Sequence, residues 1–247
     1  SKIVKFLDTK LNTQGFVDYS INGLQVDSGN QDIKRISLAV DSGLSIIEQA
    51  KNSDLLICHH GLFWGAYCEI DQLNQEKVKA LINNECSLYC SHLPLDGHLE
   101  YGNAAQIAKA LNYEYQAFFE EQGNTIGVRI LLENKINRIN FLEKLKKISA
   151  FKGVKIDSLL FGKEEISKIG ILTGSGSGFI KEFHNEIDLL ITGEAKQSAY
   201  HDAKDYKINV FFAGHYNTET FGVKALGKAL EKEFKISTLL IDEPTGI

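Results

Sequence analysis

The sequence predicts an α/β fold made of two α/β halves with layered mixed sheets. Short apolar runs alternate with longer segments of helical periodicity along the chain, which is typical of largely parallel sheets covered by helices. Two of the runs, at residues 54–57 and 188–191, share the sequence Asp-Leu-Leu-Ile, and this likeness indicates two related halves. A length of 247 residues allows one large domain or two small ones. We expect an N-terminal half over residues 1–122 and a C-terminal half over residues 123–247.

The first half is predicted to open with an amphipathic helix at residues 2–12, because its apolar side chains recur near one face. Strands and helices then alternate. Ser42 or Ser45 is available to cap the helix that follows the first strand. The predicted strands cover residues 35–41, 54–60 and 86–96, the last running out into a loop, and the helices cover 42–53, 71–85 and 102–112.

The second half repeats the strand-to-helix pattern from about Gly123 onward. A strand at residues 125–133 precedes a helix at 137–150, and the chain ends on a strand at 237–242. Between them lie three strand-to-helix segments, at residues 168–186, 188–206 and 208–234, the first with a glycine loop between its strand and its helix.

Composition and charge narrow the class of protein. The net charge is −5, from 27 basic and 32 acidic side chains, which disfavours a nucleic-acid partner held mainly through its phosphates, although a local basic patch would still allow one. Apolar runs stay below the roughly 18–20 residues that a membrane helix needs, and the amphipathic N-terminus does not resemble a signal peptide. We therefore expect a cytoplasmic protein without a membrane partner, in which Cys58, Cys68, Cys86 and Cys90 are reduced structural thiols.

Polar side chains gather where the predicted strands end, which is where sites form in open α/β sheets. The candidates at four such ends are His59 with His60, His92 with Asp96, Glu194, and His215 with Glu219. A helix that begins by Tyr216 or Asn217 would bring His215 and Glu219 together at its first turn. Imidazoles and carboxylates from separate strands form a ligand set that suits zinc, iron, manganese or nickel. The alternative is a set of surface histidines that share no site.

The number of candidate ligands indicates more than one ion. One catalytic zinc usually takes fewer protein ligands than five. Two ions that share a carboxylate would explain why adjacent histidines face different ways, and such a pair can activate a bridging water. The expected cofactors are therefore two divalent metal ions, held by His59, His60, Asp96, His215 and Glu219.

Several motifs occur in an order that resembles a known family. They are NGLQV at 22–26, HHGLFWG at 59–65, SHLPLD at 91–96, GNAAQIAKALN at 102–112, LLITGEAKQSAYHDA at 189–203 and GHYNTETFGVKAL at 214–226. Together they resemble the GTP cyclohydrolase 1 type 2 homologue family, also described as NGG-one-interacting-factor-three-like proteins. The resemblance places the five ligands just named at the family's two-metal positions. It also implies two interlinked α/β domains with the metal site at their interface, and a ring-shaped homohexamer.

The resemblance implies an activity as well: hydrolysis of GTP to formate and dihydroneopterin triphosphate. That reaction needs an activated water and a group that moves protons. The candidate proton carriers are Glu194, His92 and His201, and for Glu194 a supporting role beside a metal ligand is the alternative. Hydrolysis of another cyclic amide or of a phosphoester is a second possibility. A non-catalytic metal-bearing ring that binds a protein or DNA is a third.

Other features near these motifs have two interpretations each. The glycine loop at 173–178 is either a tight turn with close packing or a phosphate cradle assisted by Lys181. Phe63 and Trp64 either pack under a loop, which we favour, or stack on a purine. Asn22 and Gln25 either face a base edge or, more commonly, are amides that hold a turn.

Overall fold

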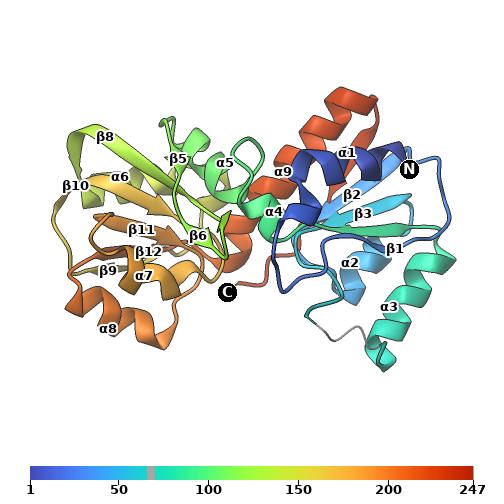
Figure 1. Cartoon of the computed structure of the whole chain (residues 1–247), viewed down its shortest axis with the longest axis horizontal. Coiled ribbons are helices and arrows are strands. Elements are labelled where there is room, and N and C mark those ends of the chain that lie inside the picture. Colours follow the sequence, from blue (N-terminus) through green and yellow to red (C-terminus); the bar gives the residue numbers. More distant parts are fainter. Residues whose placement is uncertain (66–69, 247) are drawn as a thin grey trace. The chain divides into compact units, whose positions relative to one another are not determined.

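The computed structural model describes residues 1–65 and 70–246, and it confirms the predicted α/β fold (Figure 1). The chain forms two compact units that are each made from two stretches of sequence. Unit 1 comprises Ser1–Leu95 and Gly222–Glu243, and unit 2 comprises Asp96–Phe221 and Pro244–Ile247.

This division differs from the boundary between residues 122 and 123 that the sequence suggested. The helix at Asn103–Ala110 packs into the core of unit 2, where Ala104 and Ile107 are buried. The long C-terminal helix at His215–Phe234 begins in unit 2 and contributes its later turns to unit 1. The chain passes from one unit to the other more than once, so a single boundary in the sequence cannot separate the two units.

Unit 1 is built on a five-stranded sheet in the order β1-β4-β3-β2-β13 (Figure 1). Its last four strands are parallel to one another, and β1 is an edge strand that pairs antiparallel with β4. Helices α2 and α3 cover one face, and α1 with the later turns of α9 (His215–Phe234) covers the other (Figure 1). The bounds are α1 Lys2–Leu11, β1 Gly23–Val26, β2 Arg35–Ala39, α2 Leu44–Gln49, β3 Leu55–Cys58, α3 Gln72–Asn83, β4 Ser87–Cys90 and β13 Ser237–Leu240.

Unit 2 is built on a six-stranded sheet in the order β5-β8-β10-β11-β12-β9 (Figure 1). Strands β10, β11 and β12 are parallel, and the outer strands are antiparallel. The bounds are α4 Leu93–Asp96, which crosses the boundary between the units, α5 Asn103–Ala110, β5 Gln116–Ala117, β8 Val128–Asn137, α6 Arg138–Lys146, β9 Asp157–Leu160, β10 Glu165–Ile171, α7 Ile180–Phe183, β11 Leu189–Thr192, α8 Gln197–Asp205 and β12 Asn209–Phe212, with a separate hairpin of β6 Glu120–Glu121 and β7 Asn124–Thr125.

The two Asp-Leu-Leu-Ile runs have the same hydrogen-bonding environment. Asp54 precedes β3 and Asp188 precedes β11, and each of these strands has a parallel neighbour on both sides. Each carboxylate accepts two backbone hydrogen bonds from the neighbouring strand: from Lys34 and Arg35 at 2.8 Å each, and from Ser167 and Lys168 at 2.9 and 3.1 Å. The sequence likeness therefore extends to structure, and it puts His60 and Glu194 at equivalent strand exits.

Three local expectations differ from the structure. Neither Ser42 nor Ser45 caps α2, because the helix starts after Gly43 and the Ser45 hydroxyl instead donates to Glu243 at 2.7 Å. The helix after the glycine loop is only α7, preceded by a 3₁₀ turn at Gly176–Phe179. The polar stretch before residue 35 contains the edge strand β1, whose pairing with β4 supplies stability that local sequence does not show.

The cysteines that the structure describes are buried and free. These are Cys58, Cys86 and Cys90, whereas Cys68 lies outside the described residues. Burial raises the pKa of Cys86 to about 12, so this thiol stays protonated and unreactive at neutral pH. Across residues 1–65 and 70–246 there is also no helix long and apolar enough to span a bilayer.

Candidate metal centre

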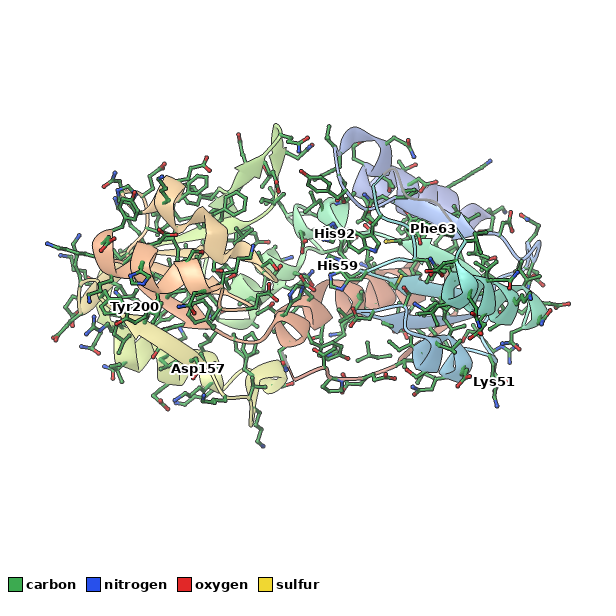
Figure 2. All side chains as sticks on the ribbon, turned by 90° about the horizontal axis from the view of Figure 1, so that it is seen from below. Lys51, His59, Phe63, His92, Asp157 and Tyr200 are labelled. Atoms are coloured by element: carbon green, nitrogen blue, oxygen red, sulfur yellow. The ribbon has the colours of Figure 1, made fainter. Side chains whose placement is uncertain are left out.

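Unit 1 brings three imidazoles together where two parallel strands end. His59 and His60 follow β3, and His92 follows β4. Figure 2 labels His59 and His92, which lie near one another. The ring centroid of His59 lies 4.8 Å from that of His60 and 5.1 Å from that of His92. One ring nitrogen from each histidine lies within 4.8 Å of the other two. These distances allow the three side chains to face a common cation.

Each of these rings uses its Nδ1 in a hydrogen bond inside unit 1. The acceptors are the Ser91 carbonyl for His59 at 2.9 Å, Asp41 for His60 at 2.8 Å and Asp18 for His92 at 2.9 Å. Carbonyl and carboxylate oxygens only accept, so Nδ1 carries the proton in each ring. In a neutral imidazole that leaves Nε2 with its lone pair, the form that binds a metal.

Asp18 holds His92 through a network of partly buried hydrogen bonds. Its side chain is 2% exposed and also accepts from the backbone N–H groups of Ser20 and Leu93, both at 3.0 Å. Burial acts against the charged carboxylate, but the hydrogen bond and charge of His92, with further donors such as Asn22, lower the pKa of Asp18 to about 2. Asp18 is therefore ionised across the neutral range and fixes the tautomer of His92.

Unit 2 brings two carboxylates and one imidazole together. Helix α9 starts at His215, so His215 and Glu219 lie one turn apart and their Nε2 and Oε2 atoms are 3.1 Å apart. One oxygen of Asp96 lies within 4.8 Å of one oxygen of Glu219. Asn103 and Thr173 orient Asp96, donating to its Oδ1 at 2.8 and 3.1 Å. Two buried carboxylates this close repel each other, which favours a cation between them.

Glu194 supports His215 from the opposite side. Its Oε2 accepts from Nδ1 of His215 at 2.9 Å, and its Oε1 accepts from the Ser175 hydroxyl at 2.5 Å. The hydrogen bonds from Ser175 and His215 lower the pKa of Glu194. Burial opposes the charged ring of His215, but the hydrogen bonds and charges of Glu219 and Glu194 outweigh it and raise the pKa of His215 to about 9. In the metal-free protein His215 is thus an imidazolium at neutral pH.

The glycine loop packs closely against this pair. At Gly174, whose φ is +59°, an added Cβ would lie 3.1 Å from Nε2 of His215 and in severe overlap with Glu219. At Gly176 it would lie 2.6 Å from Leu172. These contacts support the tight-turn interpretation: the loop needs glycine because its backbone passes against the carboxylate. Lys181 is exposed on α7.

Asn22 and Gln25 hold turns in unit 1. The amide oxygen of Asn22 accepts from the backbone N–H of His92 at 2.7 Å, and its nitrogen donates to Asp18 at 2.8 Å. Gln25 accepts from the N–H of Leu62 at 2.7 Å and donates to the Ile21 carbonyl at 2.6 Å. With both ends of each amide in use inside the protein, the interpretation as turn amides is the one that the geometry supports.

The predicted site residues thus fall into two sets, one in each unit. His59, His60 and His92 form the set of unit 1, and Asp96, Glu194, His215 and Glu219 form the set of unit 2. His201 belongs to neither set. It is exposed on α8, and its ring centroid lies 5.4 Å from that of Tyr200. Both sets have the nitrogen and oxygen donors that zinc, iron, manganese and nickel accept.

Sequence reasoning missed two acceptors that anchor the imidazoles. Asp41 lies two residues after the end of β2, so the rule that polar residues gather at strand exits could have found it. Asp18 precedes β1 in a segment without regular secondary structure, and nothing in its local sequence links it to His92, 74 positions away. Only the tertiary pairing of β1 with β4 brings that segment close.

Comparison with known proteins gives a consistent family match over the chain. The model of the family described as Duf34/NIF3 (NGG1p interacting factor 3) matches residues 1–245. The chain is 40% identical to the GTP cyclohydrolase 1 type 2 homolog of Pyrococcus abyssi, over 100% of this chain and 98% of the relative. It is 38% identical to the homolog of the same name from Deinococcus radiodurans, over 100% and 94% of the two chains.

Solved structures agree on the fold. Protein ybgI, described as a protein of unknown function, has a TM-score of 0.90 at 28% identity, over 100% of this chain and 98% of that chain. TTHA1606 from Thermus thermophilus has a TM-score of 0.89 at 34% identity, with the same coverage. The names of the two relatives describe them as homologues of a GTP cyclohydrolase.

Proposed function

Because the chain belongs to the Duf34/NIF3 (NGG1p interacting factor 3) family, we propose that it is a hydrolase that uses two divalent metal ions and acts on GTP. The observation that carries the proposal is the anchoring of the imidazoles, which leaves Nε2 of each unit 1 ring in the metal-binding form. The proposed ligands are His59, His60, Asp96, His215 and Glu219.

The donor sets of both units fit such ions. The proposed number of two ions follows from the five ligands, because these are more than one catalytic zinc usually takes from a protein. Bound there, a pair of ions would lower the pKa of a water and orient it for attack at the guanine imidazole ring. The ion could be zinc, iron, manganese or nickel, because the donors suit all four.

His92 is the proposed proton carrier of the reaction. Asp18 keeps its Nδ1 protonated, so Nε2 can take a proton from water or return one to the leaving nitrogen. Asp18 also stabilises the imidazolium that forms when Nε2 accepts that proton. Glu194 is assigned to positioning, because both of its oxygens already orient Ser175 and His215.

The experiment that tests the activity is turnover of GTP by protein loaded with one defined metal at a time. We expect formate and, after oxidation, a fluorescent pterin. If none of the four metals gives formate while two ions per chain are bound, GTP is not the substrate, and other cyclic amides and phosphoesters become the next candidates.

Metal binding by the free protein is expected to release a proton. His215 has a raised pKa of about 9, so near pH 7 its ring must lose a proton before it can bind a cation. The apparent metal affinity should therefore rise by about tenfold per pH unit from pH 7 and level off near pH 9. Calorimetry in buffers of different ionisation heat measures this proton. Two results would contradict the assignment of this proton to His215. One is metal binding without proton release, and the other is a His215→Ala variant that releases as many protons as the unmodified protein.

Replacing Glu194 with glutamine is expected to weaken metal binding by about 10- to 100-fold, the usual cost of losing an acceptor behind a ligating histidine. The neutral amide no longer stabilises the orientation and basicity of His215. Competition with a chelating dye gives the affinity. Glu186→Gln is the matched control, since Glu186 pairs with Arg129 at 3.4 Å elsewhere in unit 2. Equal affinities in the two variants would remove Glu194 from the site.

A second candidate function is a non-catalytic one. The family description names interaction with a protein, NGG1p. If the protein is not a hydrolase, this description favours a metal-bearing scaffold or regulatory protein. We propose a cytoplasmic homohexamer for either function, to be checked by light scattering. A scaffold would keep partner or DNA binding after His60→Ala, whereas the hydrolase would lose turnover.

A further inference from the structure

Trp64 lies directly beside the imidazoles of unit 1. Its ring centroid is 5.0 Å from that of His92, at an interplanar angle of 72°, and 5.9 Å from that of His60. The side chain is 37% exposed. Single exposed apolar residues are common and carry no meaning alone. An indole that contacts two candidate site histidines and still presents surface to solvent needs a further explanation.

The ring is fixed in place before any ligand arrives. Its Nε1 donates to the Gly61 carbonyl at 3.0 Å. The backbone pairs with Ser20 in an antiparallel bridge, and the N–H of Ile21 donates to the Phe63 carbonyl at 3.1 Å. A flat side chain held this way loses little entropy when a ligand stacks on it.

The neighbouring Phe63 shows what ordinary packing looks like here. Phe63 packs against the buried cluster of unit 1 that includes Leu62 and Cys58. Trp64 is more exposed, at 37%, and its ring lies against those of His92 and His60. The two adjacent aromatic residues therefore have separate roles, and the packing interpretation applies to Phe63.

We propose that Trp64 is a stacking platform for a flat heteroaromatic ring, so that the substrate class of this site is a nucleobase or a similar planar heterocycle. This inference rests on the proposed hydrolase and excludes two of its alternative substrates, because a saturated cyclic amide or a simple phosphoester has no π-face to stack. A ring on Trp64 would lie next to His92, the proposed proton carrier.

If Trp64 binds the ligand by stacking, the site should accept different nucleobases. Stacking uses the π-face that every base has, whereas discrimination requires hydrogen bonds to the base edge. The amides of Asn22 and Gln25 are engaged inside the protein and do not supply such bonds. We therefore expect guanosine and adenosine to bind unit 1 with similar affinity, and ribose 5-phosphate, which lacks a ring of this kind, to bind much more weakly.

The test uses the full-length, metal-loaded protein and calorimetric titration with guanosine, adenosine and ribose 5-phosphate. Trp64→Ala should weaken binding of both nucleosides by between about fivefold and about 150-fold. Trp64→Phe should retain most of the affinity. Tyr200→Ala, which removes a 44% exposed ring from unit 2, should change nothing. Trp64 is the only tryptophan in the chain, so each nucleoside should also quench the fluorescence of the unmodified protein, independently of how the variants fold.

The outcomes separate this inference from the proposed activity. Nucleoside binding that depends on Trp64, without formate release from GTP, supports the platform and overturns the cyclohydrolase. Formate release with unchanged nucleoside affinity in Trp64→Ala overturns the platform and leaves the activity standing. Absence of nucleoside binding and of fluorescence quenching in the unmodified protein also overturns the platform.

Discussion

Replacing Glu219 with glutamine is expected to reduce GTP turnover by on the order of a thousandfold or more. The carboxylate lies 3.1 Å from His215 and within 4.8 Å of Asp96, and it is 3% exposed. The amide has nearly the same shape but no charge, so it binds a divalent ion far less well. Loss of the several kcal/mol that a metal contributes to transition-state stabilisation corresponds to this factor. Formate release and metal content per chain measure the two effects.

The matched control for that variant lies in the same helix. Glu231 accepts from the backbone N–H and the hydroxyl of Thr238 at 3.2 and 2.7 Å, so Glu231→Gln removes an α9 carboxylate with a purely structural partner. We expect Glu231→Gln to keep both metal content and turnover. If Glu219→Gln retained two ions and full turnover, Glu219 would not be a ligand and the proposed centre would be lost.

The positions of several proposed ligands at strand exits could be predicted from the sequence. His59, His60 and His215 each follow a short, fully buried apolar run, and parallel strands bring their ends to one edge of a sheet. Helix α9 begins at His215, so its spacing to Glu219 followed from helical periodicity alone. These predictions needed only local sequence and one rule about sheets.

The supporting groups could not be predicted in the same way, because they depend on contacts between distant segments. Asp18 reaches His92 only through the pairing of β1 with β4, and β1 has no clear strand pattern. The close approach of Gly174 to Glu219 depends on how the loop after β10 meets the start of α9. Local sequence indicates that a glycine is permissive, but not which side chain it approaches.

The pKa of Asp18 predicts acid sensitivity of unit 1. A carboxyl whose pKa is lowered from 3.8 to about 2 on folding contributes about 2 kcal/mol to the free energy of unfolding. That contribution is fully present above about pH 4 and is lost as the pH falls through about 2. The partly buried Asp18–His92 pair is therefore a structural contact, and a test of its proposed role in proton transfer must be separated from its effect on stability.

Replacing Asp18 with asparagine is expected to lower turnover by about 10²- to 10⁴-fold while metal content stays unchanged. Asp18 accepts hydrogen bonds from Nδ1 of His92 and from the N–H of Leu93. An asparagine side chain has an NH₂ group, which is a donor, so it would face these donors instead of accepting from them. The ring then favours the other tautomer, with the proton on Nε2 and the basic nitrogen directed away from the substrate. Nitrogen-15 NMR of the His92 ring reports the tautomer directly.

Asp54→Asn provides the control for stability in that comparison. Asp54 is also a largely buried carboxylate of unit 1, with a side chain 14% exposed that accepts two backbone N–H groups, but it lies at the start of β3, the opposite end from His59. Both variants should lose stability in denaturant melts, because each weakens a buried acceptor. Only Asp18→Asn should move the His92 proton and depress turnover at saturating GTP. Equal turnover in the two variants, with the His92 spectrum unchanged, would mean that Asp18 acts on stability alone and that another group carries the proton.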